Sequence, residues 1–338
     1  GNRAMIKPSE FTENVSDLMA RLVPDYFDES EMAVFTGGAD VGVAFSKLAF
    51  DHLIFTGATS VGKHIMRAAA DNLVPVTLEL GGKSPTFIGR SANKDLVGQR
   101  VALGKMMNAG QICLAPDYLL VAEDQEGEVI DSVSKGVASL YPTLLKNDDY
   151  TSVVNGRNFD RLQGYLADAR EKGAEVIEVN PANEDFASAN GHKMPLHIVR
   201  GATDDMKVMQ EEIFGPILPV KTYKTIDEAI DYVNAHDRPL GLYYFGQDKS
   251  EEDRVLTRTI SGGVTVNDVL FHNAMEDLPF GGVGPSGMGN YHGLDGFRTF
   301  SHARAVYRQP KLDVAGLAGF KPPYGKATAK TLAKELKK

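Results

Sequence analysis

The first 80 residues alternate between strand-like and helix-like patterns of apolar positions. Short apolar runs at residues 4–6, 32–35, 52–55 and 75–80 predict four strands. Helical spacing of apolar residues fills the gaps, most clearly at Val15, Leu18, Met19 and Leu22 and again at 41–48 and 60–70. This alternation predicts a parallel sheet with helices on both faces, a Rossmann-like half of an α/β fold.

A second set of α/β elements follows a boundary that we place near Gly81. Thr225 and Glu228 have the spacing of a capping box, and Ser250 is the predicted cap of the next helix. Polar residues at 180–192 predict a surface loop. The predicted strands are 86–88, 118–122, 217–222, 242–245, 262–267 and 299–307, and the predicted helices are 93–107, 129–141, 159–172, 250–260 and a short basic one from Lys326.

Composition narrows the class of protein. The chain has 338 residues, enough for two domains, and a formal net charge of −9, which argues against nucleic acid or an anionic membrane as partner. No apolar run is long enough to span a bilayer, and the scattered histidines match no metal-ligand spacing, so we expect no metal. Its single cysteine cannot form an internal disulfide, which favours a reducing compartment, and we expect the cytoplasm.

That single cysteine, Cys113, is the first candidate for chemistry. It follows Asn108-Ala109-Gly110-Gln111 after a predicted helix, and Glu79 ends a predicted strand upstream. A thiol with a base available is a candidate nucleophile, but a free cysteine is also commonly a small buried hydrophobe. Residue type alone does not separate these interpretations.

The turn from Gly57 to Gly62 lies between a strand and a helix, where helix amides favour an anion. It is not a GxGxxG motif, and a plain structural turn stays an alternative. Lys7 and Glu10 end a strand that we expect in the same sheet, where they could hold ribose hydroxyls. They could equally form an exposed helix start. The glycines at 281–289 predict a tight loop, either structural or lining a site.

Five motifs in order resemble the aldehyde dehydrogenase family over nearly the whole chain. They are Lys7-Pro8-Ser9-Glu10, the Gly57 turn, Glu79-Leu80-Gly81-Gly82-Lys83, Gly110-Gln111-Ile112-Cys113 and Glu212-Ile213-Phe214-Gly215-Pro216. Four further segments are similar to its class 3 and coniferyl-aldehyde dehydrogenase-like branch: residues 278–284, 286–289, Tyr291-His292-Gly293 and Pro322-Pro323-Tyr324. Ala115-Pro116-Asp117-Tyr118 agrees with that branch.

The resemblance assigns roles residue by residue. It implies that Cys113 is the nucleophile and Glu79 the general base of NAD(P)-dependent aldehyde oxidation. It implies cofactor contacts at Lys7, Glu10, Gly57, Gly62, Glu212 and Phe214, with Thr59 or Ser60 replacing a serine that the family has where Ala58 stands. Asn267, Tyr118 and His272, with Phe271, are expected to line a substrate tunnel. The implied domains are a partial NAD(P)-binding domain at 1–81, a catalytic domain at 82–297, and an oligomerisation strand with a C-terminal tail at 298–338.

The resemblance also frames the alternatives. Glu79 distinguishes hydrolytic members from CoA-acylating ones, and the carboxylate of Glu10 favours NAD, with NADP as the alternative. The substrate is expected to be a medium-chain or aromatic aldehyde and the assembly a homodimer. Family members begin well before Lys7, with a first Rossmann strand and an oxyanion asparagine, so we expect a later part of a longer chain. A catalytically impaired fragment acting only in binding is the second hypothesis. A cofactor-free cysteine hydrolase is a third, but no histidine near Cys113 in sequence supports it.

Overall fold

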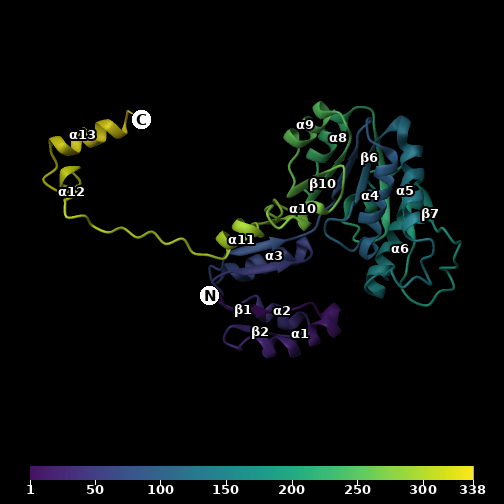
Figure 1. Cartoon of the computed structure of the whole chain (residues 1–338), viewed down its shortest axis with the longest axis horizontal. Helices are drawn as coiled ribbons and strands as arrows, with labels where there is room; N and C mark the ends of the chain where they lie inside the picture. Colours follow the sequence, from purple (N-terminus) through teal and green to yellow (C-terminus); the bar gives the residue numbers. More distant parts are fainter. Residues whose placement is uncertain (338) are drawn as a thin grey trace. The chain divides into compact units, whose positions relative to one another are not determined.

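A computed structural model describes residues 1–337; residues 1–300 form one compact unit and a second unit begins at Ser301 (Figure 1). The strands are β1 (Ala4–Ile6), β2 (Met32–Val34), β3 (Leu53–Thr56), β4 (Val76–Glu79), β5 (Pro85–Ile88), β6 (Tyr118–Ala122), β7 (Glu175–Val179), β8 (Leu196–Arg200), β9 (Ile217–Tyr223), β10 (Gly241–Phe245), β11 (Gly263–Val266) and β12 (Gly287–Met288). The helices are α1 (Glu13–Tyr26), α2 (Ala39–Phe45), α3 (Thr59–Ala70), α4 (Lys94–Met106), α5 (Glu126–Leu140), α6 (Gly156–Glu171), α7 (Lys207–Gln210), α8 (Ile226–Asn234), α9 (Lys249–Arg258), α10 (Phe271–Ala274), α11 (Gly293–Thr299), α12 (Val314–Leu317) and α13 (Lys326–Glu335). The predicted α/β class is confirmed.

The largest element of the first unit is a seven-stranded sheet in the order β11-β10-β5-β6-β9-β8-β7. All neighbouring strands are parallel except β7 and β8, which pair antiparallel at the edge. Its central strand β6 is buried along its whole length. A strand buried on both faces must be covered by helices on both sides of the sheet.

Alternate side chains of β6 enter two different cores. Leu119 and Val121 pack in a cluster with residues of α4 and α5, whereas Leu120 and Ala122 pack in a cluster with residues of α6 and α8. This follows from the two-residue repeat of a strand, which sends successive side chains to opposite faces. The loops at the ends of these strands carry the candidate site.

The first 80 residues do not form the single sheet that we predicted. β1 pairs only with β2, in parallel, while β3 pairs with β4 in a separate three-stranded sheet of order β12-β4-β3. A continuous sheet needs a ladder of hydrogen bonds between neighbouring strands, and none joins β1 to β3 within residues 1–337. Lys7 and Glu10 therefore follow a strand of a different sheet from the one that ends at the Gly57 turn.

The glycine-rich segment is structural, and it also reaches a cavity through Pro285. Gly287 pairs with Glu79 and Met288 with Leu78, so this segment forms the edge strand β12 beside β4. A Cβ at Gly287 would lie 1.9 Å from the carbonyl oxygen of Leu78, and the φ of Gly287 is +136°. Only glycine permits this close antiparallel approach to the strand that carries Glu79.

Several local predictions need correction. α9 is capped by Asp248, whose carboxylate accepts from the N–H groups of Ser250 and Glu251, and not by Ser250. Strands β7 and β8 were not predicted. The strand expected at 299–307 is also absent: α11 extends to Thr299, and no helix or strand is assigned to residues 302–310. A strand is defined by a ladder of backbone hydrogen bonds to a neighbouring strand, and no such pairing is assigned to residues 299–307 within residues 1–337.

The second unit contains α12 and α13. The hydroxyls of Thr328 and Thr331 on α13 donate to the carbonyls of Gly319 and Ala318, which hold α13 against the turn after α12. The short basic helix predicted from Lys326 is confirmed. In the part of the chain that the structure describes, no helix is long and apolar enough to cross a membrane, and no group of three His, Cys, Asp or Glu side chains gathers as around a metal ion. The domain limits at 81 and 297 stay predictions.

Candidate active site

Cys113 lies in a constrained loop between α4 and β6. After α4 the chain passes through Asn108 and Ala109, with φ values of 50° and 52°, and then Gly110 at 72°. Non-glycine residues rarely adopt this left-handed conformation, and such strain persists only where the surroundings enforce it. The loop is thus held in one conformation by its neighbours.

Gln111 supplies much of that restraint. Its side-chain amide donates to the carbonyls of Asn108 at 2.9 Å and Ser152 at 3.0 Å, and its carbonyl accepts from the N–H of Val154 at 2.8 Å. In return, Asn108 donates to the carbonyl of Gln111 at 3.0 Å. The Gly-Gln pair before the cysteine therefore fixes the loop to the segment ahead of α6.

The thiol of Cys113 is half-buried and protonated at neutral pH. Burial first, and then the charges of Glu212 and Glu79, raises the pKa of Cys113 to about 11, against the weaker lowering effect of nearby backbone N–H groups. Electrostatic coupling of this size needs proximity. The two carboxylates therefore lie within electrostatic range of the sulfur.

Glu79 is the last residue of β4 and is 3% exposed. Neither of its carboxylate oxygens has a hydrogen-bond partner within residues 1–337. Desolvation raises the pKa of Glu79 to about 8. A buried carboxyl with a pKa near the working pH can both take up and release a proton, which is the property of a general base.

Glu212 lies directly against the glycine pair that follows Glu79. A Cβ at Gly81 would be only 2.0 Å from a Glu212 carboxylate oxygen, so glycine is required there for this packing. Burial, followed by the charge of Asp117, raises the pKa of Glu212 to about 7, and the N–H of Gly82 opposes the shift. The carboxylate remains available as an acceptor at neutral pH.

A set of buried charges that the sequence did not predict supports these carboxylates. The Lys83 ammonium pairs with Asp117 and donates to the carbonyls of Val208 and Glu211, while the other Asp117 oxygen accepts from the N–H of Ile213 at 3.0 Å. The neighbouring Lys105 of α4 is fully buried, and its ammonium has no hydrogen-bond partner among the described residues. Burial first, and then the positive charge of Lys83, lowers the pKa of Lys105 to about 8, while the charges of Asp117 and Glu212 oppose the shift.

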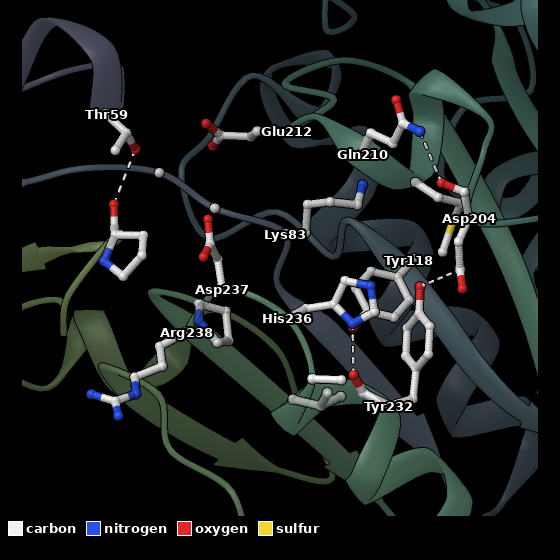
Figure 2. A pocket seen from close by; sticks show the side chains of 17 residues that line it. Thr59, Lys83, Tyr118, Asp204, Gln210, Glu212, Tyr232, His236, Asp237 and Arg238 are labelled. Atoms are coloured by element: carbon white, nitrogen blue, oxygen red, sulfur yellow. Dashed lines mark hydrogen bonds between the residues drawn. The ribbon is translucent and has the colours of Figure 1, made fainter.

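A cavity of about 600 Å³ opens beside this cluster (Figure 2). Glu212 and Lys83 face it, and Thr59 enters from the start of α3 with its hydroxyl donating to the carbonyl of Pro285 at 3.0 Å. Tyr118 also lines it, packed edge-on against Tyr232 with ring centroids 6.0 Å apart. Cys113 and Glu79 are not among the lining residues of this cavity.

The groups around the turn fit an anionic phosphate. The first turn of α3 has no acidic side chain, and no side chain caps its N-terminus. Free amides at a helix N-terminus and the positive end of its dipole favour an anion. Ser60 is exposed there and Gly62 is buried. Lys7 and Glu10 form an ion pair of 3.0 Å on the two-stranded sheet and do not line the cavity among the described residues.

Among the described residues, no hydrogen bond or ring contact joins Asn267, Tyr118 or His272 to Cys113. Asn267 is fully engaged, accepting from the N–H and donating to the carbonyl of Gly246 at 3.0 Å each. His272 is buried against Thr265, its Nδ1 lying 2.7 Å from that hydroxyl. Phe214 is 38% exposed and has a φ of 46°. Tyr118 lies at the cavity with Glu212, and the tunnel assignment stays a prediction.

Comparison with known proteins agrees with this fold. The sequence profile of the aldehyde dehydrogenase family matches residues 1–306. The chain belongs to the aldehyde dehydrogenase family, in the branch that holds coniferyl aldehyde dehydrogenases and family 3 members. A probable coniferyl aldehyde dehydrogenase of Caulobacter vibrioides is 61% identical over 338 residues, which are 100% of this chain and 70% of that protein.

Three further comparisons concern structure, cofactor and assembly. The substrate-bound AldH of Staphylococcus aureus matches with a TM-score of 0.89 and 38% identity, over 99% of this chain and 71% of that one. An indole-3-acetaldehyde dehydrogenase in complex with NAD+ matches with a TM-score of 0.79 and 26% identity, over 89% and 61%. A dog aldehyde dehydrogenase named as dimeric and NADP-preferring is 39% identical, over 96% of this chain and 69% of that protein.

Proposed function

We propose that the chain oxidises an aldehyde to its carboxylic acid, with Cys113 as nucleophile, Glu79 as general base and NAD as hydride acceptor. The observation that carries the proposal is the convergence of Cys113, Glu79 and Glu212. These side chains come from three distant segments, yet the two carboxylates raise the pKa of the thiol. A thiol beside a buried base is the arrangement needed for covalent catalysis.

Cys113 carries the first half of the reaction. Its sulfur attacks the aldehyde carbon, and its proton passes to the carboxylate of Glu79. Protonation of that carboxylate also removes one of the negative charges that disfavour the thiolate. The Cys113 N–H, just after the loop segment that Gln111 restrains, would donate to the oxygen of the resulting thiohemiacetal.

The cofactor is expected to lie along the cavity. The start of α3, from Thr59 to Gly62, would receive its pyrophosphate, and Glu212 would accept from ribose hydroxyls. Bound there, NAD would supply the hydride acceptor needed to oxidise the thiohemiacetal to a thioester. Lys7 and Glu10 are proposed to hold the adenosine ribose, where the carboxylate favours NAD over NADP.

Glu79 carries the second half. Once the proton taken from Cys113 has passed to solvent, the Glu79 carboxylate accepts a proton from water, whose oxygen attacks the thioester carbon, and the C–S bond breaks to release the acid and the Cys113 thiolate. With its pKa at about 8, a substantial fraction of Glu79 can accept that proton near neutral pH. This step separates acid formation from transfer of the acyl group to a thiol such as CoA.

The names of two relatives suggest which substrate and which assembly to propose for this chain. Coniferyl aldehyde, an aromatic aldehyde, is the substrate named for the Caulobacter relative, so we propose aromatic or medium-chain aldehydes here. A homodimer is proposed by the same logic from the dimeric relative in dog. A cytoplasmic location remains part of the proposal.

The test is incubation with NAD and a panel of aromatic and aliphatic aldehydes, following NADH. Cys113→Ala should abolish turnover. Glu79→Gln should slow the burst of NADH, because the thiol loses the base that takes its proton, and should abolish steady turnover, because the thioester that does form is not hydrolysed. Glu171→Gln on exposed α6 is the matched control and should behave as wild type.

Turnover that survives Cys113→Ala would exclude the proposed nucleophile. Because the chain covers 70% of the Caulobacter relative, the same assay is run on a longer protein that includes this chain. Activity only in the longer protein would favour the impaired-fragment hypothesis, and no activity in either would contradict the function.

A further inference from the structure

Tyr291, a tyrosine to which the sequence motifs assigned no role, lies where the second half of the proposed reaction would take place. Tyr291 follows the glycine-rich segment and forms two backbone hydrogen bonds with Phe280, of 2.9 and 2.8 Å. Between these two residues the chain forms β12, which pairs with the end of β4 at Glu79. The N–H of Leu80 also donates to the carbonyl of Ser286 at 3.1 Å. The segment that carries Tyr291 is thus bonded to the strand that carries Glu79.

The ring of Tyr291 is held beside Cys113. Both residues pack against one small apolar cluster formed by Leu114, Leu240 and Phe280. The ring meets Phe280 edge to face, with centroids 5.6 Å apart, and meets His292 in the same way at 4.8 Å. These contacts fix the ring through its apolar part and leave the hydroxyl to be placed by the polar groups around it.

The phenol of Tyr291 is electrostatically coupled to both reacting side chains. Burial first, then the charges of Glu79 and Cys113, raises the pKa of Tyr291. The phenol therefore keeps its proton and acts as a hydrogen-bond donor. The titratable groups around it are Glu79 from β4, Cys113 from the loop before β6, and the adjacent His292.

Glu79 is the nearby group that can accept a hydrogen bond. Both its oxygens are buried and find no partner in residues 1–337. A buried carboxylate without hydrogen bonds is costly, and a polar contact too long to be direct is commonly bridged by one water. A water that donates to the Glu79 carboxylate could at the same time accept a hydrogen bond from the Tyr291 hydroxyl.

Resting on the proposed function, we infer that Tyr291 positions the hydrolytic water: its hydroxyl and the Glu79 carboxylate hold one water and aim it at the thioester carbon on Cys113. One O–H of that water points to Glu79, which takes the proton as the oxygen bonds to carbon. The C–S bond then breaks, the thiolate of Cys113 leaves, and the carboxylic acid departs. No further reactant is needed.

The test uses Tyr291→Phe, which keeps the ring and its packing, with exposed Tyr26→Phe as the matched control. The full chain is mixed with NAD and an aromatic aldehyde, and burst and steady phases of NADH are measured across pH. The burst should be unchanged while the steady rate falls about 10- to 100-fold, within the range that a positioned group contributes. Loss of the donor also raises the pKa of Glu79, so the acid limb of kcat should move to higher pH.

A second measurement needs no turnover. Iodoacetamide labelling of Cys113 is followed against pH in wild type, Tyr291→Phe, Glu79→Gln and the double variant. The labelling rate plotted against pH should show an inflection from Glu79, which is absent in Glu79→Gln. In Tyr291→Phe this inflection should move upward by about half a pH unit, as expected for loss of one water-mediated hydrogen bond. In the Glu79→Gln background, Tyr291→Phe should have no effect.

The outcomes separate the two proposals. If the wild-type chain forms no NADH, the function fails for this chain while the labelling profile still tests Tyr291. If Tyr291→Phe matches Tyr26→Phe in the steady rate and in both pH profiles, the inference is wrong. An equal fall in burst rate and steady rate would also overturn it, because that pattern indicates disturbed packing around Cys113.

Discussion

The side-chain amide of Gln111 donates to the carbonyl of Ser152 at 3.0 Å and so connects the cysteine loop to the segment ahead of α6. Together with its bonds to Asn108 and Val154, this makes Gln111 the main polar restraint on a loop that contains two left-handed non-glycine residues. The loop conformation depends on that restraint, because the backbone would otherwise relax from the left-handed region.

Gln111→Ala should therefore destabilise the protein by about 2–4 kcal/mol, since it leaves buried backbone groups without partners. It should also lower turnover by releasing the loop before Cys113. Urea unfolding and NADH formation measure the two effects. Gln99→Ala, on the exposed face of α4, is the control and should change neither. Wild-type stability in Gln111→Ala would show that the restraint lies elsewhere.

The reactivity of Cys113 should depend steeply on pH. With a thiol pKa of about 11, the thiolate fraction rises tenfold per pH unit, so alkylation should accelerate about 100-fold from pH 7 to pH 9. Glu212→Gln removes the carboxylate that raises the thiol pKa more than Glu79 does, and it should therefore speed alkylation at pH 8. A flat profile between pH 7 and 9 would show that the thiolate already exists.

Stability should fall as Glu79 ionises. Its folded-state pKa of about 8 lies above the ordinary value of 4.5, so between these pH values the folded state binds more protons than the unfolded state. Stability contributed by the neutral carboxyl is complete below pH 4.5 and is lost as pH rises through 8. Glu79→Gln should gain at most about 4 kcal/mol at pH 8 relative to pH 4.5, measured by denaturant unfolding. An equal gain at both pH values would contradict the assignment.

The two buried lysines should respond in opposite directions. Lys83→Met strands the Asp117 carboxylate without its ion pair and should destabilise the protein by about 3–5 kcal/mol. Lys105→Met removes an unpaired buried ammonium and should stabilise it at pH 7, by up to about 3 kcal/mol.

The sign for Lys105 follows from its lowered pKa. The folded state binds fewer protons than the unfolded state between pH 8 and 10.5, so wild-type stability rises across that window. The advantage of Lys105→Met should shrink over the same range in thermal unfolding. Destabilisation at pH 7 would show that Lys105 has a partner in solution.

Glu10 should set the choice between NAD and NADP. A backbone hydrogen bond first and the Lys7 ammonium second hold the pKa of Glu10 below its usual value, so it is ionised at neutral pH. Glu10→Gln removes the charge that would repel a 2′-phosphate and should raise the NADP-to-NAD ratio of kcat/KM at least tenfold. Glu13→Gln, one helical turn on, is the control. An unchanged ratio would place cofactor selection elsewhere.

Local sequence patterns predicted most elements to within a residue or two, because continuous apolar runs such as that of β6 have few alternatives. They did not predict β7, where Val176 and Ile177 stand together between glutamates and break the two-residue alternation of a half-buried strand. β8 does have a short apolar run, beside a polar loop, but we did not predict it as a strand. Ser250 and Asp248 are both capping residues two positions apart, and sequence alone did not choose between them.

The candidate site was predicted where motifs exist and missed where only packing reveals it. Cys113, Glu79 and Glu212 came from motifs, and the two carboxylates raise the pKa of the thiol in the folded chain. Lys105 is spaced four residues from Val101 and eight from Val97, which places it on the buried face of α4, but a lysine is usually expected at the surface. The role inferred for Tyr291 depends on β12 pairing with β4, a long-range contact that no local pattern encodes.

The pairing of strands also determines how the site is assembled. Glu79 ends β4 in the three-stranded sheet, whose other parallel strand, β3, leads to the Gly57 turn, whereas Cys113 precedes β6 of the seven-stranded sheet. Glu79 and the Gly57 turn therefore belong to the three-stranded sheet, whereas Cys113 belongs to the loop before a strand of the seven-stranded sheet. The spacing of Cys113 and Glu79 therefore depends on how the two sheets pack against each other and not on strand pairing within either sheet.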